Sequence, residues 1–167
     1  MDPAQKKTAL RMIPYGLYVF TSKAADGSST AATVNWVTQA SFEPPLVVVG
    51  VKADSNANTI VRAAKSFALN ILGKGQGDIA YAYFKSVEDD GKSIGGQPYR
   101  IGITGAPILQ VTPAFVECKL VEIVDKGDHA IVVGEVVDAG VSQQPEGRAD
   151  DAILWMKDLG PKLFYGG

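Results

Sequence analysis

A single histidine stands in the turn Gly127-Asp128-His129, where two β-rich segments meet. Imidazole is the only side chain whose ordinary pKa lets it gain or lose a proton near neutral pH. His129 is therefore the natural candidate for proton transfer or for a catalytic contact with a substrate. A histidine in a turn can also be a solvated residue without a role, and the residues alone leave both interpretations open.

The segment Lys52–Thr59 (KADSNANT) offers a cation and several short polar side chains directly after an apolar run. We expect Asp54 or Ser55 to cap a helix at residues 56–65, because such side chains bind the free N–H groups of the first turn. A helix N-terminus attracts anions, and Lys52 adds a positive charge. The segment is a candidate phosphate site, with a simple helix cap as the alternative.

The segment Ala32–Trp36 (ATVNW) ends a predicted strand at a polar bend, which continues through Thr38 to Ser41 and the Pro44-Pro45 pair. Backbone N–H and C=O groups that leave a sheet at a bend need other partners, and the polar edge of a bound ring could supply them. The other interpretation is an ordinary strand end with Trp36 in the core.

Common catalytic and metal-binding motifs are missing from the sequence. One histidine and one cysteine, Cys118, cannot supply an ordinary zinc site, and no serine lies in a G-x-S-x-G motif. Neither a phosphate-loop motif nor G-x-G-x-x-G is present. We predict no metal site, and we infer that a cofactor carries the difficult step if the protein is an enzyme.

The composition is that of a globular protein. The length of 167 residues, 46% of them hydrophobic, predicts one domain over residues 1–167. The net charge of -2, with both signs scattered, argues against a nucleic-acid surface. One cysteine excludes an intrachain disulfide, and no apolar run approaches the ~20 residues of a membrane span. The N-terminal residues lack the apolar run of a secretory signal. We expect a cytoplasmic protein that makes no membrane contact.

Hydrophobic patterning predicts short strands joined mostly by hairpins. We expect strands at Gly16–Lys23, Thr30–Val37, Leu46–Val51, Ser66–Leu72, Ala114–Val124 and His129–Ala139. We expect helices from Pro3 to Met12, at residues 56–65, at residues 78–84 with Asp78 as the cap, and at Ala149–Met156. Leu46–Val51 is apolar throughout, which predicts a strand buried on both faces. Residues 85–107 show no clear period and are predicted to form a long loop. The pattern favours a mainly β antiparallel barrel with short helices over a doubly wound sheet.

In this order, the three polar segments resemble the flavin reductase-like family, also called the FMN-binding split barrel. The family includes flavoredoxin-like proteins and the reductase partners of two-component monooxygenases. The resemblance runs from Ile13-Pro14-Tyr15-Gly16 to Phe164-Tyr165-Gly166. It includes Ser41-Phe42-Glu43-Pro44-Pro45-Leu46, Phe67-Ala68-Leu69-Asn70-Ile71-Leu72, and Gly134-Glu135-Val136 after the histidine turn. It implies a split β-barrel of antiparallel Greek-key type.

The resemblance also implies a homodimer with flavin near the subunit interface. The flavin ring and ribityl chain would be lined by Thr33, Val34, Asn35, Trp36 and Ser41. The phosphate would be held by Lys52, Ser55, Asn58 and Thr59. His129 would lie near the ring, where the family's histidine is thought to assist nicotinamide binding or proton movement, and Tyr165 would approach from the tail. FMN is favoured over FAD, because the phosphate site is compact and no adenine pocket is evident.

The function that we expect is reduction of flavin by NAD(P)H, with electrons passed to free flavin, an Fe(III) complex, a partner protein or oxygen. One alternative is an FMN electron-transfer module that a partner protein reduces. Another is a flavin-free barrel that binds a different ligand. A third alternative is membership of the related pyridoxamine-phosphate oxidase family. That family would need more basic residues to bind its phosphate ligand than this chain offers.

Overall fold

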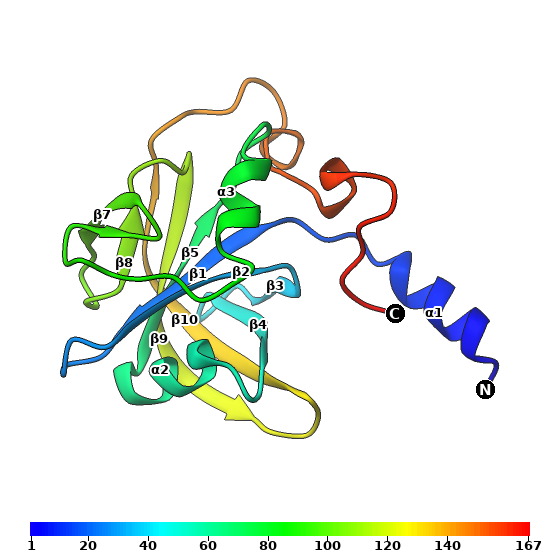
Figure 1. The fold of residues 1–167 in the computed structure, drawn as a ribbon, viewed down its shortest axis with the longest axis horizontal. Coiled ribbons are helices and arrows are strands. Elements are labelled where there is room, and N and C mark those ends of the chain that lie inside the picture. The colour runs from blue at the N-terminus through cyan, green and yellow to red at the C-terminus, as the bar shows by residue number, and fades with distance from the viewer.

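The strands form one large and one small sheet in a computed structural model that describes residues 1–167 (Figure 1). The large sheet has seven antiparallel strands in the order β2-β1-β5-β9-β10-β4-β3. These are β1 (Tyr18–Lys23), β2 (Ser29–Val34), β3 (Val37–Ser41), β4 (Leu46–Lys52), β5 (Ser66–Ile71), β9 (Ala114–Val124) and β10 (His129–Val141). The small sheet consists of β6 (Ser93–Ile94), β7 (Gln97–Ile101) and β8 (Pro107–Leu109).

The large sheet curls into a half-open barrel because its two edge strands are neighbours in sequence. The edges are β2 and β3, and only Asn35 and Trp36 connect them. Adjacent strands lie about 4.8 Å apart, so this connection cannot span a flat sheet of seven strands. The N–H group of Gly50 in β4 donates to the carbonyl of Trp36 at 2.8 Å and holds the junction.

Two apolar clusters fill the inside of the curl. The first contains Phe20 and Phe67, whose rings stack with centroids 5.0 Å apart. It is closed by α2 (Asn56–Ala64), which buries Ala57, Ile60 and Val61. The second cluster includes Leu17, Leu72 and Tyr83, and it is covered by α3 (Gly77–Ala82).

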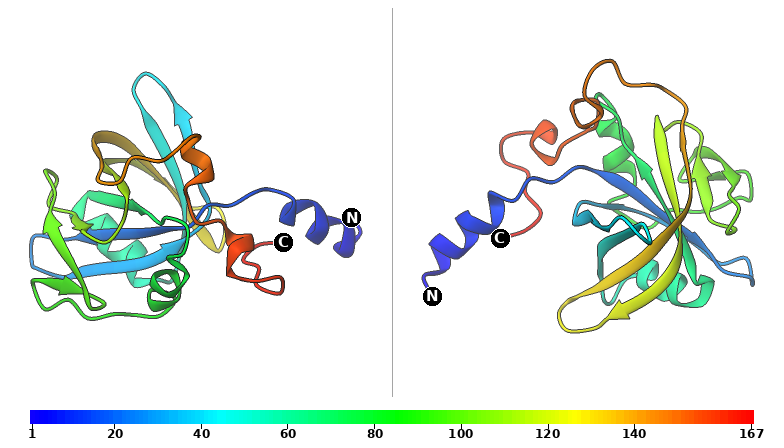
Figure 2. Two further views of the ribbon diagram at one scale, coloured as in Figure 1. Left: turned by 90° about the horizontal axis from the view of Figure 1, so that it is seen from above. Right: turned by 180° about the vertical axis from the view of Figure 1, so that it is seen from behind.

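The helix before β1 and the last residues of the chain lie together to one side of the barrel (Figure 2). The helix α1 (Pro3–Arg11) begins at Asp2, whose carboxylate accepts from the N–H of Ala4 at 2.8 Å, and it buries none of its residues. After β10, two 3-10 turns, Ala149–Asp151 and Met156–Leu159, lead to a C-terminus beside α1. No helix has both the length and the apolar character that crossing a bilayer requires.

The mainly β antiparallel prediction is confirmed, and the differences have local reasons. The strand predicted at Thr30–Val37 is split, because Asn35 and Trp36 carry the chain from one sheet edge to the other. The long loop predicted at residues 85–107 instead contains β6, β7 and the start of β8. These strands are short and separated by glycines, so the sequence shows no alternating pattern. The strand at Leu46–Val51 alternates between buried and half-buried residues, because only one face of the curled sheet meets the core.

Two predictions about helices were also wrong. Asp78 does not cap α3; the cap position is Gln76, and Asp78 lies in the first turn, where its charge favours the helix dipole. The helix predicted at Ala149–Met156 is two separate 3-10 turns. Between them the chain is extended, and the N–H of Leu154 donates to the carbonyl of Leu72 at 2.8 Å.

Candidate functional site

A cavity of about 430 Å³ lies beside the ends of β2 and β4, the start of β10 and the N-terminus of α2. Most of the residues that line it are hydrophobic. This size and lining are typical of small-molecule sites. The strands supply its walls because the curl of the sheet brings β2 and β4 to the same side of the barrel.

One part of the cavity is polar and positively charged. The Oγ atom of Ser55 caps α2, accepting from the N–H of Asn58 at 3.2 Å and donating to the carbonyl of Lys52 at 2.6 Å. The N–H groups of Asn56 and Ala57 open the helix and therefore have no partner within it. This arrangement leaves two backbone donors pointing out of a helix N-terminus, which suits an anion.

Lys52 adds a cation at the end of β4. Its Nζ atom lies 3.0 Å from a carboxylate oxygen of Asp54, and this hydrogen bond raises the pKa of Lys52. The lysine is therefore charged at neutral pH. Both partners are exposed, and an exposed ion pair contributes little stability, so Lys52 can turn from Asp54 to a bound anion at small cost.

Three rings gather beside Lys52, whose cross-strand neighbour is His129. The His129 ring centroid lies 4.5 Å from that of Trp36 and 5.9 Å from that of Tyr165. Nδ1 of His129 lies 3.0 Å from the carboxylate of Asp128, and Nε2 lies 2.8 Å from the Tyr165 hydroxyl. The His129 side chain is only 15% exposed. The interpretation of His129 as a freely solvated turn residue does not fit this environment.

The partners of His129 define which ring nitrogen carries the proton. The hydrogen bond with His129 lowers the pKa of Asp128, so this carboxylate is ionised at neutral pH and can only accept. We assign the proton of the neutral ring to Nδ1, and Nε2 then accepts from the Tyr165 hydroxyl. Asp128 and Tyr165 together fix both the tautomer and the orientation of the ring.

Trp36 shapes the cavity from behind its wall. Its indole packs on Gly50, where a Cβ atom would lie 3.0 Å from the ring, so any side chain at residue 50 would displace it. The indole Nε1 atom is buried and has no hydrogen-bond partner. An unpaired buried donor costs about 1–3 kcal/mol, so an acceptor brought by a ligand or partner would stabilise this position.

The residues predicted from the sequence divide into two groups. Those that line the cavity are Thr33, Val34, Asn35, Lys52, Ser55, His129 and Tyr165. Those that lie outside it are Trp36, Ser41, Asn58 and Thr59. Ser41 ends β3, on the hairpin that projects away from the barrel (Figure 2).

The two residues of α2 lie outside the cavity for a local reason. The Asn58 side chain is buried, donates to the carbonyl of Ala53 at 2.7 Å and accepts from Arg62 at 3.1 Å, so both ends of its amide are occupied. The Thr59 hydroxyl donates to the carbonyl of Ser55 at 3.4 Å, back along its own helix. Both side chains stabilise the helix that carries the anion site.

Sequence reasoning missed much of the cavity wall. Ala32 and Ala57 line the cavity and lie within the segments named from the sequence, whereas the residues missed are Leu17, Gly50, Val51, Tyr83, Phe84, Met156, Leu163 and Phe164. Among them, Tyr83 donates to the carbonyl of Ile94 at 2.8 Å, and burial raises its pKa to about 12. The aromatic run Tyr81–Phe84 was the available signal, but apolar residues become a wall only through packing.

The C-terminal tail, residues 160–167, lies along one edge of the cavity. The carbonyl of Tyr165 accepts from Nδ2 of Asn35 at 3.1 Å. Nε of Arg11 donates to the carbonyl of Gly166 at 3.3 Å, and its guanidinium lies 4.3 Å from the ring centroid of Phe164. These contacts bring the end of α1 and the C-terminal tail to the edge of the site.

The chain is an antiparallel half-barrel with a cavity that reaches the N-terminus of α2, Lys52 and His129. A family model described as "Flavin reductase like domain" matches residues 10–164. The chain therefore belongs to the flavin reductase-like family. Among solved structures, the NADH:FAD oxidoreductase SgcE6 of Streptomyces globisporus has a TM-score of 0.71 and 27% identity, covering 84% of this chain and 86% of that one.

Curated relatives give the same family. A flavin reductase of Pseudomonas putida is 27% identical, covering 94% of this chain and 88% of that protein. An NADH:FMN oxidoreductase of Rhodococcus qingshengii is 28% identical, covering 86% of this chain and 73% of that protein. Other relatives are longer: the chain spans 42% and 57% of two Rhizobium meliloti proteins, about half their length.

Proposed function

We propose that the chain is a flavin reductase that binds FMN in the cavity beside α2 and receives hydride from NAD(P)H. The observation that carries this proposal is one continuous cavity that joins the N-terminus of α2 and Lys52 to His129 along an apolar wall. A flavin nucleotide has the matching parts, namely an anionic phosphate and a flat, largely apolar ring with a polar edge.

The side chains present fit such a ligand. The free N–H groups of Asn56 and Ala57, with Lys52, suit the phosphate. Leu17, Val34 and Phe84 belong to the apolar wall that suits the ring. Oδ1 of Asn35 receives no hydrogen bond from the protein, so it can accept one from the polar edge of a ring.

Bound flavin would supply what the side chains lack, a group that accepts hydride from a nicotinamide and passes electrons to free flavin, an Fe(III) complex or a partner protein. The side chains of the protein would position the flavin and the nicotinamide and shield the flavin ring from water. The apolar wall excludes water from the ring. His129, held by Asp128 and Tyr165, can orient the nicotinamide or move a proton at Nε2 once the Tyr165 hydroxyl releases it.

The relatives support flavin reduction by NADH, but they do not decide between FMN and FAD. One is described as an NADH:FMN oxidoreductase and another as an NADH:FAD oxidoreductase. We favour FMN because the anion site is a single helix N-terminus with one lysine, which matches one phosphate.

Anaerobic titration of the purified protein with NADH and with NADPH tests the function. We expect flavin absorption, present as purified or after FMN is added, to bleach with at least one nucleotide. Flavin bands that persist with both nucleotides but bleach with a reductase protein would instead support the electron-transfer module. A protein that stays colourless after addition of FMN would overturn the proposal in favour of a flavin-free barrel.

Replacement of the histidine tests its role. His129→Ala should slow flavin reduction by NAD(P)H about tenfold, by analogy with the loss of one hydrogen bond to a polar group, and should change the FMN dissociation constant less. Stopped-flow absorbance measures the first and fluorescence titration the second. Lys126→Ala, in the same exposed turn, is the matched control. An unchanged rate in His129→Ala would remove the histidine from the reaction.

We further propose that the chain acts as a homodimer. Phe42 on the β3–β4 hairpin is 88% exposed, and α1 buries no residue in the single chain. The exposed side chains of Phe42 and, at the end of α1, of Leu10, Met12 and Ile13 are apolar surface that an oligomer would cover. Light scattering after gel filtration should give twice the chain mass, and Phe42→Asp should shift it toward the monomer. A monomeric wild-type protein at all accessible concentrations would contradict this part.

A further inference from the structure

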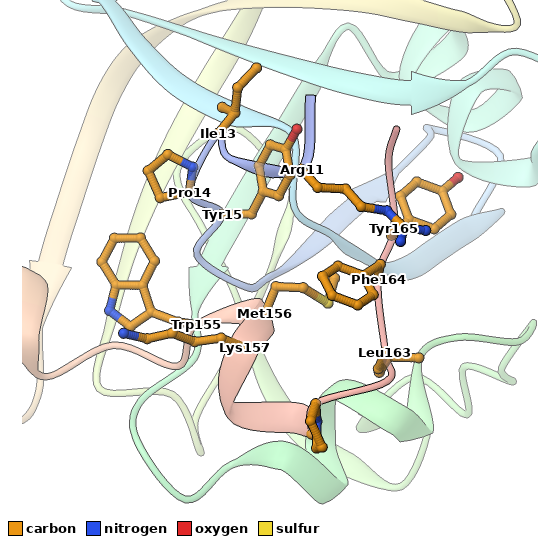
Figure 3. Close-up of a pocket in the computed structure, with 12 residues that line it drawn as sticks. Arg11, Ile13, Pro14, Tyr15, Trp155, Met156, Lys157, Leu163, Phe164 and Tyr165 are labelled. Atoms are coloured by element: carbon orange, nitrogen blue, oxygen red, sulfur yellow. The ribbon is translucent and has the colours of Figure 1, made fainter. Parts of the chain in front are cut away.

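A second cavity, of about 360 Å³, lies between the N-terminal and C-terminal segments (Figure 3). Its N-terminal wall includes Arg11 and Tyr15, and its C-terminal wall includes Trp155, Lys157 and Phe164. The two walls are fixed to each other, because the N–H of Met156 donates to the carbonyl of Tyr15 at 2.9 Å and Gly16 forms a β-bridge with Trp155. The cavity is therefore built by the pairing of the two segments.

This cavity combines aromatic faces with two cations that form no ion pair, although Arg11 also lies over the Phe164 ring and donates to the Gly166 carbonyl. Tyr15, Trp155 and Phe164 offer surfaces on which a flat heterocycle can stack. Arg11 and Lys157 have no carboxylate within ion-pair distance, since the ion pairs of the chain involve other residues. A cavity with aromatic walls and two unpaired cations is complementary to a purine nucleotide with a pyrophosphate.

The second cavity adjoins the flavin cavity across the tail. The two share Met156, Leu163, Phe164 and Tyr165 as lining residues. The second cavity contains no residue between Lys52 and Thr59, which is the segment that holds the proposed flavin phosphate. It therefore lies next to the Tyr165 side of the flavin cavity, where a nicotinamide would react.

We propose that the second cavity binds the adenosine diphosphate half of the nicotinamide dinucleotide, with the aromatic side chains against the adenine and with Arg11 and Lys157 against the pyrophosphate. This inference rests on the proposed function. It adds a subsite that anchors the hydride donor by its unreactive half, so that binding energy from that half positions the nicotinamide.

FAD carries the same adenosine diphosphate group, and its position would differ. Its adenosine is joined to the flavin phosphate, which we place at the N-terminus of α2. It would leave the flavin cavity near Ser55 and Asn56, where a smaller cavity of about 170 Å³ also includes Lys85. The second cavity adjoins none of these residues, so we assign it to the nicotinamide dinucleotide.

A truncated hydride donor separates this inference from the proposed function. N-benzyl dihydronicotinamide carries the reactive ring without the adenosine diphosphate. With FMN as the flavin, we expect kcat/KM for NAD(P)H to exceed that for the truncated donor by about tenfold or more. ADP-ribose should inhibit NAD(P)H oxidation competitively and leave oxidation of the truncated donor much less affected. Failure of the protein to oxidise either donor would defeat the proposed function itself.

Variants of one exposed cation locate the subsite. Lys157→Ala should raise KM for NAD(P)H and the dissociation constant of ADP-ribose by about five- to tenfold, with kcat little changed, and Lys157→Glu should do so more strongly. Both variants should oxidise the truncated donor at the wild-type rate. Lys74→Ala and Lys74→Glu, at an exposed lysine outside both cavities, are the matched controls.

Three results would overturn the inference. Equal kcat/KM for the two donors in the wild-type protein, or unchanged ADP-ribose binding in Lys157→Glu, would show that the cavity does not hold the nucleotide. Weakened binding of FAD but not of NAD(P)H in Lys157→Glu would assign the subsite to the flavin. In each case bleaching of FMN by NAD(P)H would still support the proposed function.

Discussion

Two long segments close the barrel, and they are anchored by different chemistry. Residues 85–109, the small-sheet segment, are tied to the barrel by two carboxylates that lie largely out of solvent. Residues 160–167, the C-terminal tail, are held by hydrogen bonds with Arg11, Asn35 and His129 and by the cation–π contact of Arg11 with Phe164. In the sequence, residues 85–107 showed no clear period, whereas the tail was singled out only for Tyr165.

Glu117 is the first anchor of the small-sheet segment. It is fully buried in β9 and accepts from the N–H groups of Ile103 and Thr104 at 3.0 and 2.6 Å, and from the Thr104 hydroxyl. Gly102 is required beside it, because a Cβ atom there would collide with the carboxylate. A buried carboxylate is tolerated only when such donors satisfy it, so this loop conformation and the barrel specify each other.

Asp89 is the second anchor. It accepts from Lys23 at 2.8 Å, from Ser29 at 2.8 Å and from Tyr99 at 2.9 Å, which joins the segment to β1 and β2. Burial raises its pKa, but these hydrogen bonds, with that of the Gly91 N–H, outweigh burial and lower the pKa to about 2.

The small-sheet segment and the tail therefore differ in the free energy that it costs to move them away from the barrel. A segment fixed by buried charges opens only with a large loss of stability, whereas exposed hydrogen bonds are exchanged for water at small cost. We therefore expect the small-sheet segment to be a fixed part of the fold, and the tail to be the part that moves when a ligand binds.

The largest expected effect comes from Glu117→Ala. It removes three accepted hydrogen bonds, leaves the N–H groups of Ile103 and Thr104 without their acceptor and opens a cavity, so we expect a loss of about 4 kcal/mol in the free energy of unfolding. Urea denaturation followed by circular dichroism measures it. Glu122→Ala, exposed on the same strand, should cost less than about 0.5 kcal/mol. Similar losses for the two variants would mean that Glu117 is not an anchor.

Asp89→Asn should have an intermediate effect of about 2 kcal/mol, because it removes the charge that four donors face. Because the folded pKa lies below the unfolded value of about 3.9, the contribution is complete above that value and is lost as the pH falls toward about 2. The stability difference between the wild type and the variant should therefore shrink across this window. Glu88→Gln, an exposed neighbour, is the control, and a difference that stayed constant with pH would contradict the assignment.

The smallest effect is expected at the tail. Tyr165→Phe removes one hydrogen bond to His129 and should cost about 0.5 kcal/mol, which corresponds to an increase of roughly twofold in amide hydrogen exchange of residues 160–167. Residues 85–109 should exchange as in the wild type. Tyr81→Phe is the matched control, because Tyr81 is 46% exposed and Tyr165 is 47% exposed. It removes a hydrogen bond to the carbonyl of Leu159 instead of one to His129. Equal acceleration in both segments would remove the distinction between them.

Local chemistry made much of the fold and part of the site predictable. The hairpin from Ala114 to Val141 and the cap at Ser55 follow from alternation and capping within short stretches, whereas the anion site of α2 stays a prediction. For the same reason Lys52, Ser55 and His129 could be named in advance, since their chemistry is evident from residue type and local context. Asn58 had the right type and spacing, but its amide was taken by Ala53 and Arg62.

The sequence by itself determined a mainly β protein of the flavin reductase-like family, with a candidate anion site on one helix and a histidine in the last hairpin. Only the tertiary structure decided that β2 and β3 are opposite edges of one sheet, that Glu117 and Asp89 hold the small-sheet segment, and that Tyr165 lies against His129. The reason is the range of the interactions. Caps and alternation act over a few residues, whereas the curl of the sheet and the buried hydrogen bonds join residues far apart in sequence, and their positions follow from how the whole chain packs.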